Sequence, residues 1–442
     1  MGHHQRMTYQ QTIDYLFSSL PMFQRIGDAA IKKDLTNIKL LCEGLGQPQE
    51  DFPCIHIAGT NGKGSTSHML ASVFQAAGLK TGLYTSPHYV DFRERIRING
   101  NMIGETDVIR FVKKQKESWA VIKPSFFEIT VAMAFDFFRN EKVDIAIIET
   151  GLGGRLDSTN IIRPLMSVIT NIGLDHMNML GDTLPQIAFE KAGIIKPGTP
   201  VIIGEWHKET AGVFVEKARR EHAPIHFASR HLKVMRKENL LSNTIVDVST
   251  RSGQWLSRLR CDLTGPYQLQ NIRTVLEALL WWNHDQPQWT LTDRMIRRGL
   301  AHVKTKTQLI GRWMILGRKP LVITDAAHNH HGMLAMLPQL LRIPVHQRHF
   351  VLGFVSDKDI GKILSLFPVN GRYYWCAPGI PRAKAPADTQ SAGIQFGLNG
   401  EAYDSVSEAF EAARKGAGKG DLIFIGGSSY VVGDFLAGAV KK

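Results

Sequence analysis

The sequence has no apolar run close to the roughly 20 residues that a membrane-spanning helix requires. Residues 1–7 lack the apolar core of a signal peptide. Cysteine is scarce, and the four that occur lack metal-binding spacing. They are Cys42, Cys54, Cys261 and Cys376. These absences argue against a membrane protein or a disulfide scaffold, and we expect a cytoplasmic globular protein with reduced thiols.

Acidic residues are also relatively few, because the sequence has 40 aspartates and glutamates and 53 lysines and arginines. The resulting net charge of +13 favours anionic partners such as nucleotides and acidic metabolites, although a solvated basic surface is an equally good explanation. No dense basic run with interleaved aromatics occurs, which argues against nucleic acid. The length of 442 residues predicts two or three domains.

The stretch 54–68 has the pattern of a phosphate-binding loop. Ile55 and Ile57 predict a strand, glycines then surround Lys63, and an apolar helical pattern follows. The glycines are Gly59, Gly62 and Gly64, and the helical apolar residues include Met69, Leu70, Val73, Phe74 and Ala77. Glycines allow backbone N–H groups to face phosphates, and the helix N-terminus adds partial positive charge.

The match to the general phosphate-loop pattern is incomplete. Ile57 stands where a first glycine is usual, and Gly64 separates Lys63 from the hydroxyl residues Ser65 and Thr66. The alternative is a glycine-rich turn with a surface lysine. The agreement of strand, loop and helix signals favours the phosphate-binding interpretation.

Polar residues follow three further predicted strands, where parallel sheets bind ligands. Ser86 follows the strand 81–84, and Asp175 and His176 follow the strand 165–170. Glu149 ends a buried strand and precedes a glycine-rich segment, so it could hold magnesium or pair with Arg155. His176, taken alone, is more typical of a structural histidine.

The helical segments contain further candidate residues. Lys191 lies in the apolar end of a helix within 187–196. It could extend to solvent, or, once desolvated, accept carbon dioxide as a carbamate. Ser125 and Glu128 have capping-box spacing, which predicts a structural role. The loop 21–27 either contacts a ligand or merely connects two helices.

The second half predicts short strands over 225–260, a helix with Asn271 near its start and a helix at 292–301. The polar segment 302–310 is the candidate linker. The alternation of strands and helices then restarts, with strands at 321–324, 350–353, 372–376 and 422–425 and helices at 330–342, 357–367 and 405–415. Asp325 follows the first of these strands. We therefore expect an α/β protein with a first domain over 1–301 and a smaller one over 311–442.

In the motifs formed by these residues, the chain resembles folylpolyglutamate synthase/dihydrofolate synthase, the folate branch of the Mur ligase superfamily. The matching motifs are 59–65, 85–88, 92–96, 149–160, 175–176, 190–194, 311–312 and 325–329. The resemblance implies a doubly wound, mainly parallel sheet of the P-loop type, followed by a Rossmann-like ligase domain. It also implies that ATP, with Mg²⁺, drives ligation of L-glutamate to tetrahydrofolate or 7,8-dihydropteroate through an acyl phosphate, by a monomer without nucleic-acid or membrane partners.

The resemblance also assigns roles to particular residues. For ATP they are Thr60, Asn61, Gly62, Lys63, Gly64, Ser65, Asn271, Arg312, Asp325 and His328. For the metal they are Ser86, Glu149, His176 and Lys191, the last as a carboxylated lysine. For folate or pteroate they are Phe23, Arg25, Ser125, Phe127 and Arg155. Lys63, His176 and Lys191 would be the catalytic residues.

Two departures from the family pattern concern the turn after Asp325 and the N-terminal loop. His330 stands where the family often has proline, and the N-terminal loop differs from the pattern associated with pteroate binding. Glutamate addition is therefore better supported than dihydrofolate synthesis. One alternative is a peptidoglycan Mur ligase, but only about 55 residues precede the phosphate loop, too few for a UDP-binding domain. The other is a nucleotide-switched binding module, which would need neither Glu149 nor Lys191.

Overall fold

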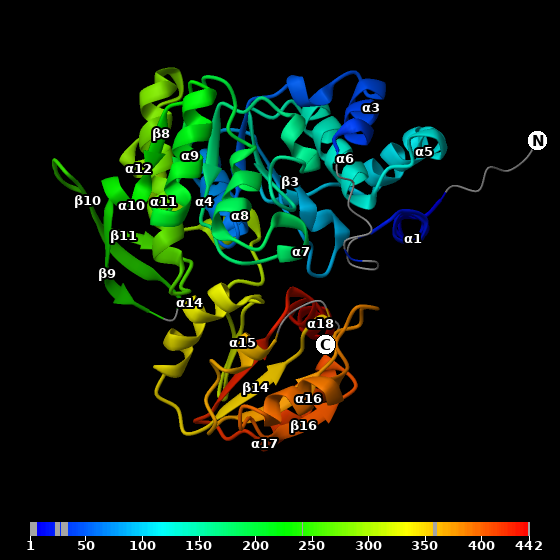
Figure 1. The fold of residues 1–442 in the computed structure, drawn as a ribbon, viewed down its shortest axis with the longest axis vertical. Coiled ribbons are helices and arrows are strands. Elements are labelled where there is room, and N and C mark those ends of the chain that lie inside the picture. The colour runs from blue at the N-terminus through cyan, green and yellow to red at the C-terminus, as the bar shows by residue number, and fades with distance from the viewer. Residues whose placement is uncertain (1–6, 23–26, 28–33, 241, 357–359, 441–442) are drawn as a thin grey trace, which may run out of the picture. The chain divides into compact units, whose positions relative to one another are not determined.

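The computed structural model describes residues 7–22, 27, 34–240, 242–356 and 360–440 (Figure 1). The chain divides into two compact units. The first contains residues 1–237, 246–261 and 270–308, and the second contains residues 238–245, 262–269 and 309–442. Among the described residues, none of the helices combines the length and apolar character that crossing a bilayer demands.

The described residues of the first unit form an eight-stranded sheet in the order β4-β3-β2-β5-β1-β6-β7-β8. The strands from β2 to β8 in this order are parallel, and β3 and β4 are antiparallel additions at one edge. The bounds are β1 Cys54–Ala58, β2 Thr81–Tyr84, β3 Ile96–Ile98, β4 Asn101–Met102, β5 Ile145–Glu149, β6 Met166–Ile169, β7 Val201–Ile203 and β8 Ile225–Phe227. Strands β1 and β5 are buried throughout, as expected for parallel strands with both faces covered.

Helix α4 (Lys63–Ala76) is the central helix of this unit, because every residue from Ser65 to Phe74 is buried. It packs against β1, β2, β5 and α12. The other helices are α1 Tyr9–Ser19, α3 Thr36–Gly44, α5 Glu105–Ile122, α6 Phe126–Asn140, α7 Met177–Leu180, α8 Leu184–Ala192, α9 Lys208–Arg220, α10 Ala228–His231, α11 Gln268–Asp285, α12 Asp293–Leu300 and α13 Val303–Thr307. The phosphate-loop helix is thus anchored over most of its length in the core.

A separate antiparallel sheet of three strands has the order β11-β10-β9. Its bounds are β9 Lys233–Asn239, β10 Thr244–Thr250 and β11 Gly253–Cys261. This agrees with the short strands predicted for 225–260. The buried residues of β10 alternate with partly exposed ones, the pattern of a sheet with one covered face.

The described part of the second unit contains a six-stranded sheet in the order β12-β13-β17-β14-β15-β16. Only β12 is antiparallel. The strands are β12 Met314–Arg318, β13 Leu321–Thr324, β14 Arg348–Leu352, β15 Arg372–Cys376, β16 Gly400–Tyr403 and β17 Leu422–Gly426, and the helices are α14 His330–Leu341, α15 Gly361–Leu364, α16 Pro386–Ile394, α17 Val406–Gly416 and α18 Ser429–Val440. Large buried side chains such as Phe350, Trp375 and Phe424 fill its core.

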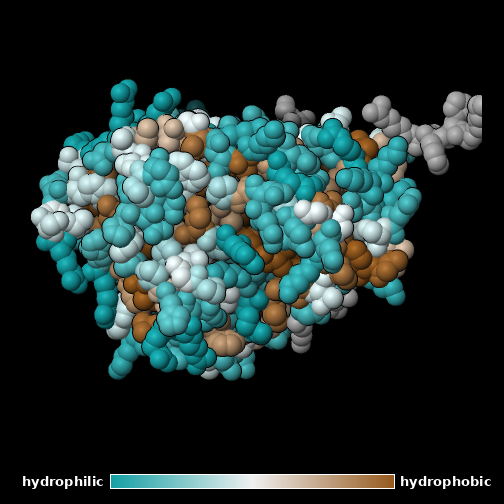
Figure 2. Space-filling view, turned by 90° about the horizontal axis from the view of Figure 1, so that it is seen from above, coloured by the Kyte–Doolittle hydropathy of each residue, from teal (hydrophilic) through white to brown (hydrophobic). Residues whose placement is uncertain are grey.

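Hydrophilic residues cover most of the face shown in Figure 2, with hydrophobic residues in separate groups. The expected fold class, a mainly parallel sheet followed by a smaller α/β unit, is confirmed. Some elements differ from the prediction. Helix α15 is shorter than predicted, β12, β16, α16 and α18 were not predicted, and the segment expected as a linker contains α13.

Candidate active site

The candidate site lies at the carboxyl ends of four neighbouring parallel strands, β2, β5, β1 and β6. The register pairs Ile57 of β1 with Glu149 at the end of β5, and Tyr84 of β2 with Ile148. Loops that leave these strands therefore start side by side at one sheet edge, the ligand-binding edge of open α/β sheets. Adjacency in the sheet brings together residues that are up to about 120 positions apart in the chain.

The phosphate loop requires glycine at two positions. Gly59 has a φ of 149° and Gly62 a φ of 84°, and a Cβ at Gly62 would lie 2.3 Å from the amide oxygen of Asn271. Helix α4 then begins at Lys63, and the Thr66 amide donates to the carbonyl of Gly62. The amides of the first helical turn precede this bond and have no acceptor within the helix, as at anion-binding helix N-termini.

The segment after β6 fixes the shape of this loop. The Thr60 amide donates to the Asn171 carbonyl at 2.9 Å, and the Asn61 amide donates to the Asn171 side chain at 2.9 Å. The hydroxyl of Thr170 donates to the Asn61 carbonyl at 2.6 Å. Thr170 and Asn171 were not predicted as site residues, although Asn171 is the first residue of the polar segment that follows a predicted strand. Hydrogen bonds within the protein itself therefore hold the loop in this conformation.

Lys63 is folded over its own loop. Its Nζ donates to the carbonyl of Gly59 at 3.0 Å and to that of Thr60 at 3.4 Å. A cation is thus held at the helix N-terminus, where phosphate oxygens would compete with two neutral carbonyls for it. Because hydrogen bonds between charged partners are the stronger ones, a bound triphosphate would recruit this side chain.

Glu149 is nearly fully buried and lies beside the segment after β2. The Ser86 amide donates to its Oε2 at 3.4 Å. Arg155 forms its ion pair with Glu190 at 2.9 Å, so the alternative in which Arg155 pairs with Glu149 is wrong. A carboxylate at the end of a buried strand, next to a serine, offers hard oxygen ligands of the kind that Mg²⁺ prefers.

The third strand end contributes Asp175 and His176. His176 has a left-handed backbone conformation, with φ of 50°, and is the N-cap residue that precedes helix α7. Its amide donates to Asp175 Oδ1 at 2.9 Å, and its Nε2 lies 3.9 Å from Asp175 Oδ2. A left-handed conformation is uncommon for a residue other than glycine.

Lys191 is buried in α8, with 4% of its surface exposed. Burial, and after it the positive charge of Lys63, lowers its pKa to about 7 against the opposing effect of Asp175. An amine with this pKa is about half neutral at pH 7, and the neutral amine is the form that adds to carbon dioxide. The side chains of Lys63, Asp175 and Lys191 therefore interact electrostatically although they come from three separate segments.

The glycine-rich loop after Glu149 packs tightly against α8. A Cβ at Gly154 would lie 2.9 Å from the Glu190 carbonyl, and one at Gly193 would lie 2.3 Å from the Arg155 Cα. Asp157 holds this loop, because its carboxylate accepts hydrogen bonds from the amides of Leu152 and Thr159. The Thr159 hydroxyl also donates to Asp157 Oδ1 at 2.6 Å and contacts His56 Nε2 on β1 at 2.8 Å.

The residues suggested for folate have a mixed outcome. Ser125 and Glu128 form the predicted capping box, with bonds of 2.7 and 3.2 Å. Phe127 lies against Gly151, where an added Cβ would be 2.4 Å from its ring. The remaining candidates, Phe23 and Arg25, lie outside the described residues.

The donor set can be tested for its fit to a hydrated magnesium ion. No three His, Cys, Asp or Glu side chains are grouped as metal ligands within the described ranges. The predicted set contains only two such residues, Glu149 and His176, with Ser86 and Lys191 as the others. The hydroxyl of Thr150, next to Glu149, is buried without a hydrogen-bond partner. Few protein ligands and an oxygen-rich surrounding suit Mg²⁺, which retains several waters.

The second unit has its own polar strand end. Asp325 follows β13 and is almost completely buried, and burial raises the pKa of its carboxyl. It accepts hydrogen bonds from the Tyr267 hydroxyl, from the Trp313 amide at 2.8 Å and from the Ala327 amide at 2.9 Å. His328 contacts the Ala326 carbonyl through Nδ1 at 3.0 Å. Arg312 interacts electrostatically with Asp325.

The fold and the first site define a nucleotide-binding α/β protein with a phosphate loop. The sequence profile of the Mur ligase middle domain matches residues 57–279, and that of the Mur ligase glutamate ligase domain matches residues 311–429. The chain is 33% identical to the dihydrofolate synthase/folylpolyglutamate synthase of Bacillus subtilis, over 91% of this chain and 94% of that protein.

Other relatives agree. The chain is 32% identical to the folylpolyglutamate synthase of Lacticaseibacillus casei, over 99% of this chain and 98% of that protein. The solved structure of Escherichia coli FolC in complex with DHPP and ADP matches with a TM-score of 0.84 and 28% identity, over 98% of both chains. This chain therefore belongs to the folylpolyglutamate synthase/dihydrofolate synthase family of Mur ligases, as the motifs predicted.

Proposed function

We propose that this protein is an ATP-dependent ligase that joins L-glutamate to tetrahydrofolate, and also to 7,8-dihydropteroate. The observation that carries the proposal is the convergence of the phosphate loop, Glu149 and the buried Lys191 at one sheet edge in a chain of this family. The relatives named for both activities support the second acceptor, whereas the L. casei relative is named for polyglutamate addition alone.

The reaction explains why such a site is needed. A carboxylate is a poor electrophile, so its oxygen first attacks the γ-phosphorus of ATP, giving an acyl phosphate and ADP. The amino group of glutamate then attacks the acyl carbon, the amide bond forms, and phosphate leaves with the carbon–oxygen bonding pair. The protein's task is positioning and charge neutralisation.

The residues of the first unit divide this work. The loop 60–65 and the Lys63 ammonium would hold the phosphates, with Asn271 beside Gly62 as a further ATP contact. When bound, Mg²⁺ would neutralise phosphate charge, and Ser86, Glu149, His176 and carboxylated Lys191 are the residues that would hold it directly or through water. The carbamate matters because it turns a cation into an anionic oxygen donor.

Further contacts are assigned from both units. Arg312, Asp325 and His328 of the second unit are proposed nucleotide contacts. Arg155 and Phe127, which flank the glycine-rich loop, are proposed folate contacts together with Ser125, Phe23 and Arg25. We assign ATP binding and catalysis to residues 1–301 and the ligase domain to residues 311–442, with 302–310 joining them, in a monomer that works in the cytoplasm, where its small-molecule substrates occur.

A coupled phosphate-release assay tests the proposal. Phosphate should appear only when ATP, L-glutamate and a reduced folate or pteroate are all present. Release without either acceptor or glutamate would favour a nucleotide switch, and dependence on a UDP-muropeptide would favour a peptidoglycan ligase. Product analysis with tetrahydrofolate and 7,8-dihydropteroate offered separately then decides which acceptors are used.

A further inference from the structure

The segment 85–95, between β2 and β3, is an excursion over the sheet edge that carries Ser86. Its two ends are held together, because the Thr85 amide donates to the Arg95 carbonyl at 3.0 Å and β2 pairs with β3. The short helix η3 (Phe92–Arg95) closes the excursion. An excursion of this length needs internal bonds to keep one conformation.

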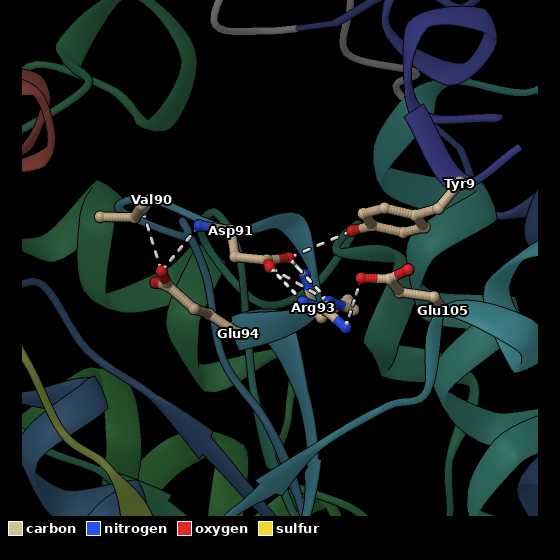
Figure 3. Close-up of polar contacts among 6 residues, drawn as sticks. All are labelled: Tyr9, Val90, Asp91, Arg93, Glu94 and Glu105. Atoms are coloured by element: carbon tan, nitrogen blue, oxygen red, sulfur yellow. Dashed lines mark hydrogen bonds and ion pairs between the residues drawn. The ribbon is translucent and has the colours of Figure 1, made fainter. Parts of the chain in front are cut away.

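Glu94 supplies those bonds. Its carboxylate accepts three consecutive backbone amides, from Tyr89 at 2.8 Å, Val90 at 2.9 Å and Asp91 at 2.8 Å. Figure 3 shows the side chain turned back under Val90 and Asp91. With 9% of Glu94 exposed, water cannot readily replace the carboxylate. Charge-assisted bonds to backbone amides are among the stronger hydrogen bonds in proteins.

The next residue holds the other part of the loop. The Arg95 Nε donates to His88 Nδ1 at 2.8 Å, and Arg95 is almost fully buried against the ring of Phe126. Because Nδ1 accepts this bond, the proton of neutral His88 resides on Nε2. The His88 ring also stacks on Phe17, with a ring separation of 6.1 Å. Two adjacent side chains thus fix the backbone of 89–91 and the orientation of His88.

Ser86, the second residue after β2, is the point in the segment 85–95 where the backbone contacts Glu149. The Ser86 amide to Glu149 Oε2 distance is 3.4 Å, so a small shift of the loop would break this contact. The strand end and the loop are therefore aligned by Glu94, which itself lies outside the predicted ligand set.

The outer side of the same loop offers a built-in comparison. There Arg93 pairs with Asp91 at 2.7 Å and with Glu105 at 3.1 Å, and the Tyr9 hydroxyl donates to Asp91 at 3.1 Å (Figure 3). The Glu105 side chain is 50% exposed, and ion pairs with such exposed partners contribute little to the stability of the fold. Glu105 contacts this loop through Arg93. Among the bonds described, its carboxylate accepts no hydrogen bond from a backbone amide of the loop.

We propose that Glu94 is a positioning residue of the ligase reaction: its carboxylate fixes the segment 86–91 so that Ser86 stays beside Glu149 in the geometry that binds the metal–nucleotide complex. The proposal rests on the proposed function for its catalytic consequence, but its structural content does not. Residues behind metal ligands typically change metal affinity 10- to 100-fold when they are replaced.

Hydrogen exchange of the unaltered full-length protein is the first test. The amides of Tyr89, Val90 and Asp91 should exchange at least about tenfold more slowly than the same amides in an unstructured peptide, because each donates to a buried carboxylate. Exchange at the unstructured rate would overturn the proposal without any variant having to fold.

The second test compares Glu94→Gln with Glu105→Gln. Glutamine keeps the size of glutamate but has one acceptor oxygen, and its NH₂ group would face at least one backbone amide. Glu94→Gln should lose the protection of amides 89–91 and raise the Mg²⁺ concentration for half-maximal AMPPCP binding about tenfold. Glu105→Gln should match the unaltered protein in both measurements.

The outcomes also separate this proposal from the proposed function. Unchanged exchange and unchanged Mg²⁺ dependence in Glu94→Gln would overturn the positioning role even if glutamate ligation is fully established. Conversely, absence of glutamate-dependent phosphate release from the unaltered protein would defeat the ligase proposal, while the exchange and AMPPCP measurements would still decide the role of Glu94. Should Glu94→Gln fail to fold, the exchange rates of amides 89–91 in the unaltered protein still decide whether the Glu94 carboxylate holds them.

Discussion

The two units present polar groups at the carboxyl ends of parallel strands by different means. In the first unit, backbone amides and carbonyls from several strand ends bond to one another, and charges such as Lys63 and Lys191 lie among them. In the second unit, a single buried carboxylate, Asp325, gathers three donors around itself. The first arrangement is suited to a multiply charged ligand that reacts, and the second to holding one group in place.

Replacing Lys63 by alanine is the sharpest way to test this difference. The ammonium is the charge held at the phosphate loop, and removing one preorganised charged donor of this kind costs about 10²- to 10³-fold in kcat. The measurement is the steady-state rate of ADP formation with saturating folate and glutamate. Lys113→Ala, at an exposed lysine of α5, is the control and should keep the full rate. A normal kcat in Lys63→Ala would contradict a role for the first site in the chemical reaction.

Lys191→Ala should cause the next largest loss, about 10²-fold. Because the proposed ligand is a carbamate oxygen, short carboxylates such as acetate at high concentration should restore part of the rate to this variant. The same additive should not help Lys63→Ala. Full activity of Lys191→Ala without additive would contradict a carbamate at this position.

The depressed pKa of Lys191 also predicts a pH effect on stability. Its pKa is about 7 in the folded chain and 10.5 as the reference value, so the unfolded chain binds more protons between these values. Stability of the metal-free protein should therefore rise as the pH increases from about 7 towards 10.5. Urea unfolding at pH 7 and pH 9 should show a smaller rise in Lys191→Met than in the Lys113→Met control.

Asp325→Asn tests the second unit. The side chain keeps its shape but loses its charge, and a charged hydrogen bond is worth about 1.5–3 kcal/mol, which corresponds to roughly 10- to 100-fold in affinity. We expect the KM for ATP to rise by that factor while kcat changes less than in Lys63→Ala. A larger effect on kcat than on KM would contradict the proposed difference between the two units, in which Asp325 binds the nucleotide and the first site carries the reaction.

Tyr267→Phe should have the smallest effect. It removes one of the three donors to Asp325 and leaves the Trp313 and Ala327 amides in place. The expected loss of stability is about 1–2 kcal/mol, measured by urea unfolding. Activity at saturating ATP should remain close to that of the unaltered protein. A severe loss of activity would assign the hydroxyl a direct role with the substrate.

Local patterns predicted the elements that place the first site. The strand, glycine loop and helix around Lys63, the buried strand ending on Glu149 and the capping box of Ser125 all depend on residues close in the chain. Weakly patterned elements such as β16 and α16 escaped prediction. Strand β16 has no fully buried residue, so it carries no alternation of apolar and polar positions.

The predicted site residues themselves needed a family resemblance, because spacing alone left His176 and Lys191 ambiguous. The supporting residues were missed for a related reason. Asn171 and Thr170 form hydrogen bonds with a loop about 110 positions earlier in the chain, and no local sequence pattern around them predicts such a distant partner. Glu94 lies within the motif 92–96, but its three amide partners are identified only in the folded loop.

The sequence by itself determined the class of protein, the strands and helices that place the first site and the chemistry of the loop at Lys63, because each follows from residues within a few positions of one another. Tertiary structure decided which strand ends meet, that Arg155 pairs with Glu190, and that Lys191 is buried near Lys63 and Asp175. The physical reason is that strand order in the sheet and desolvation depend on the packing of distant segments, and the pKa of an amine follows its surroundings more than its neighbours in the chain.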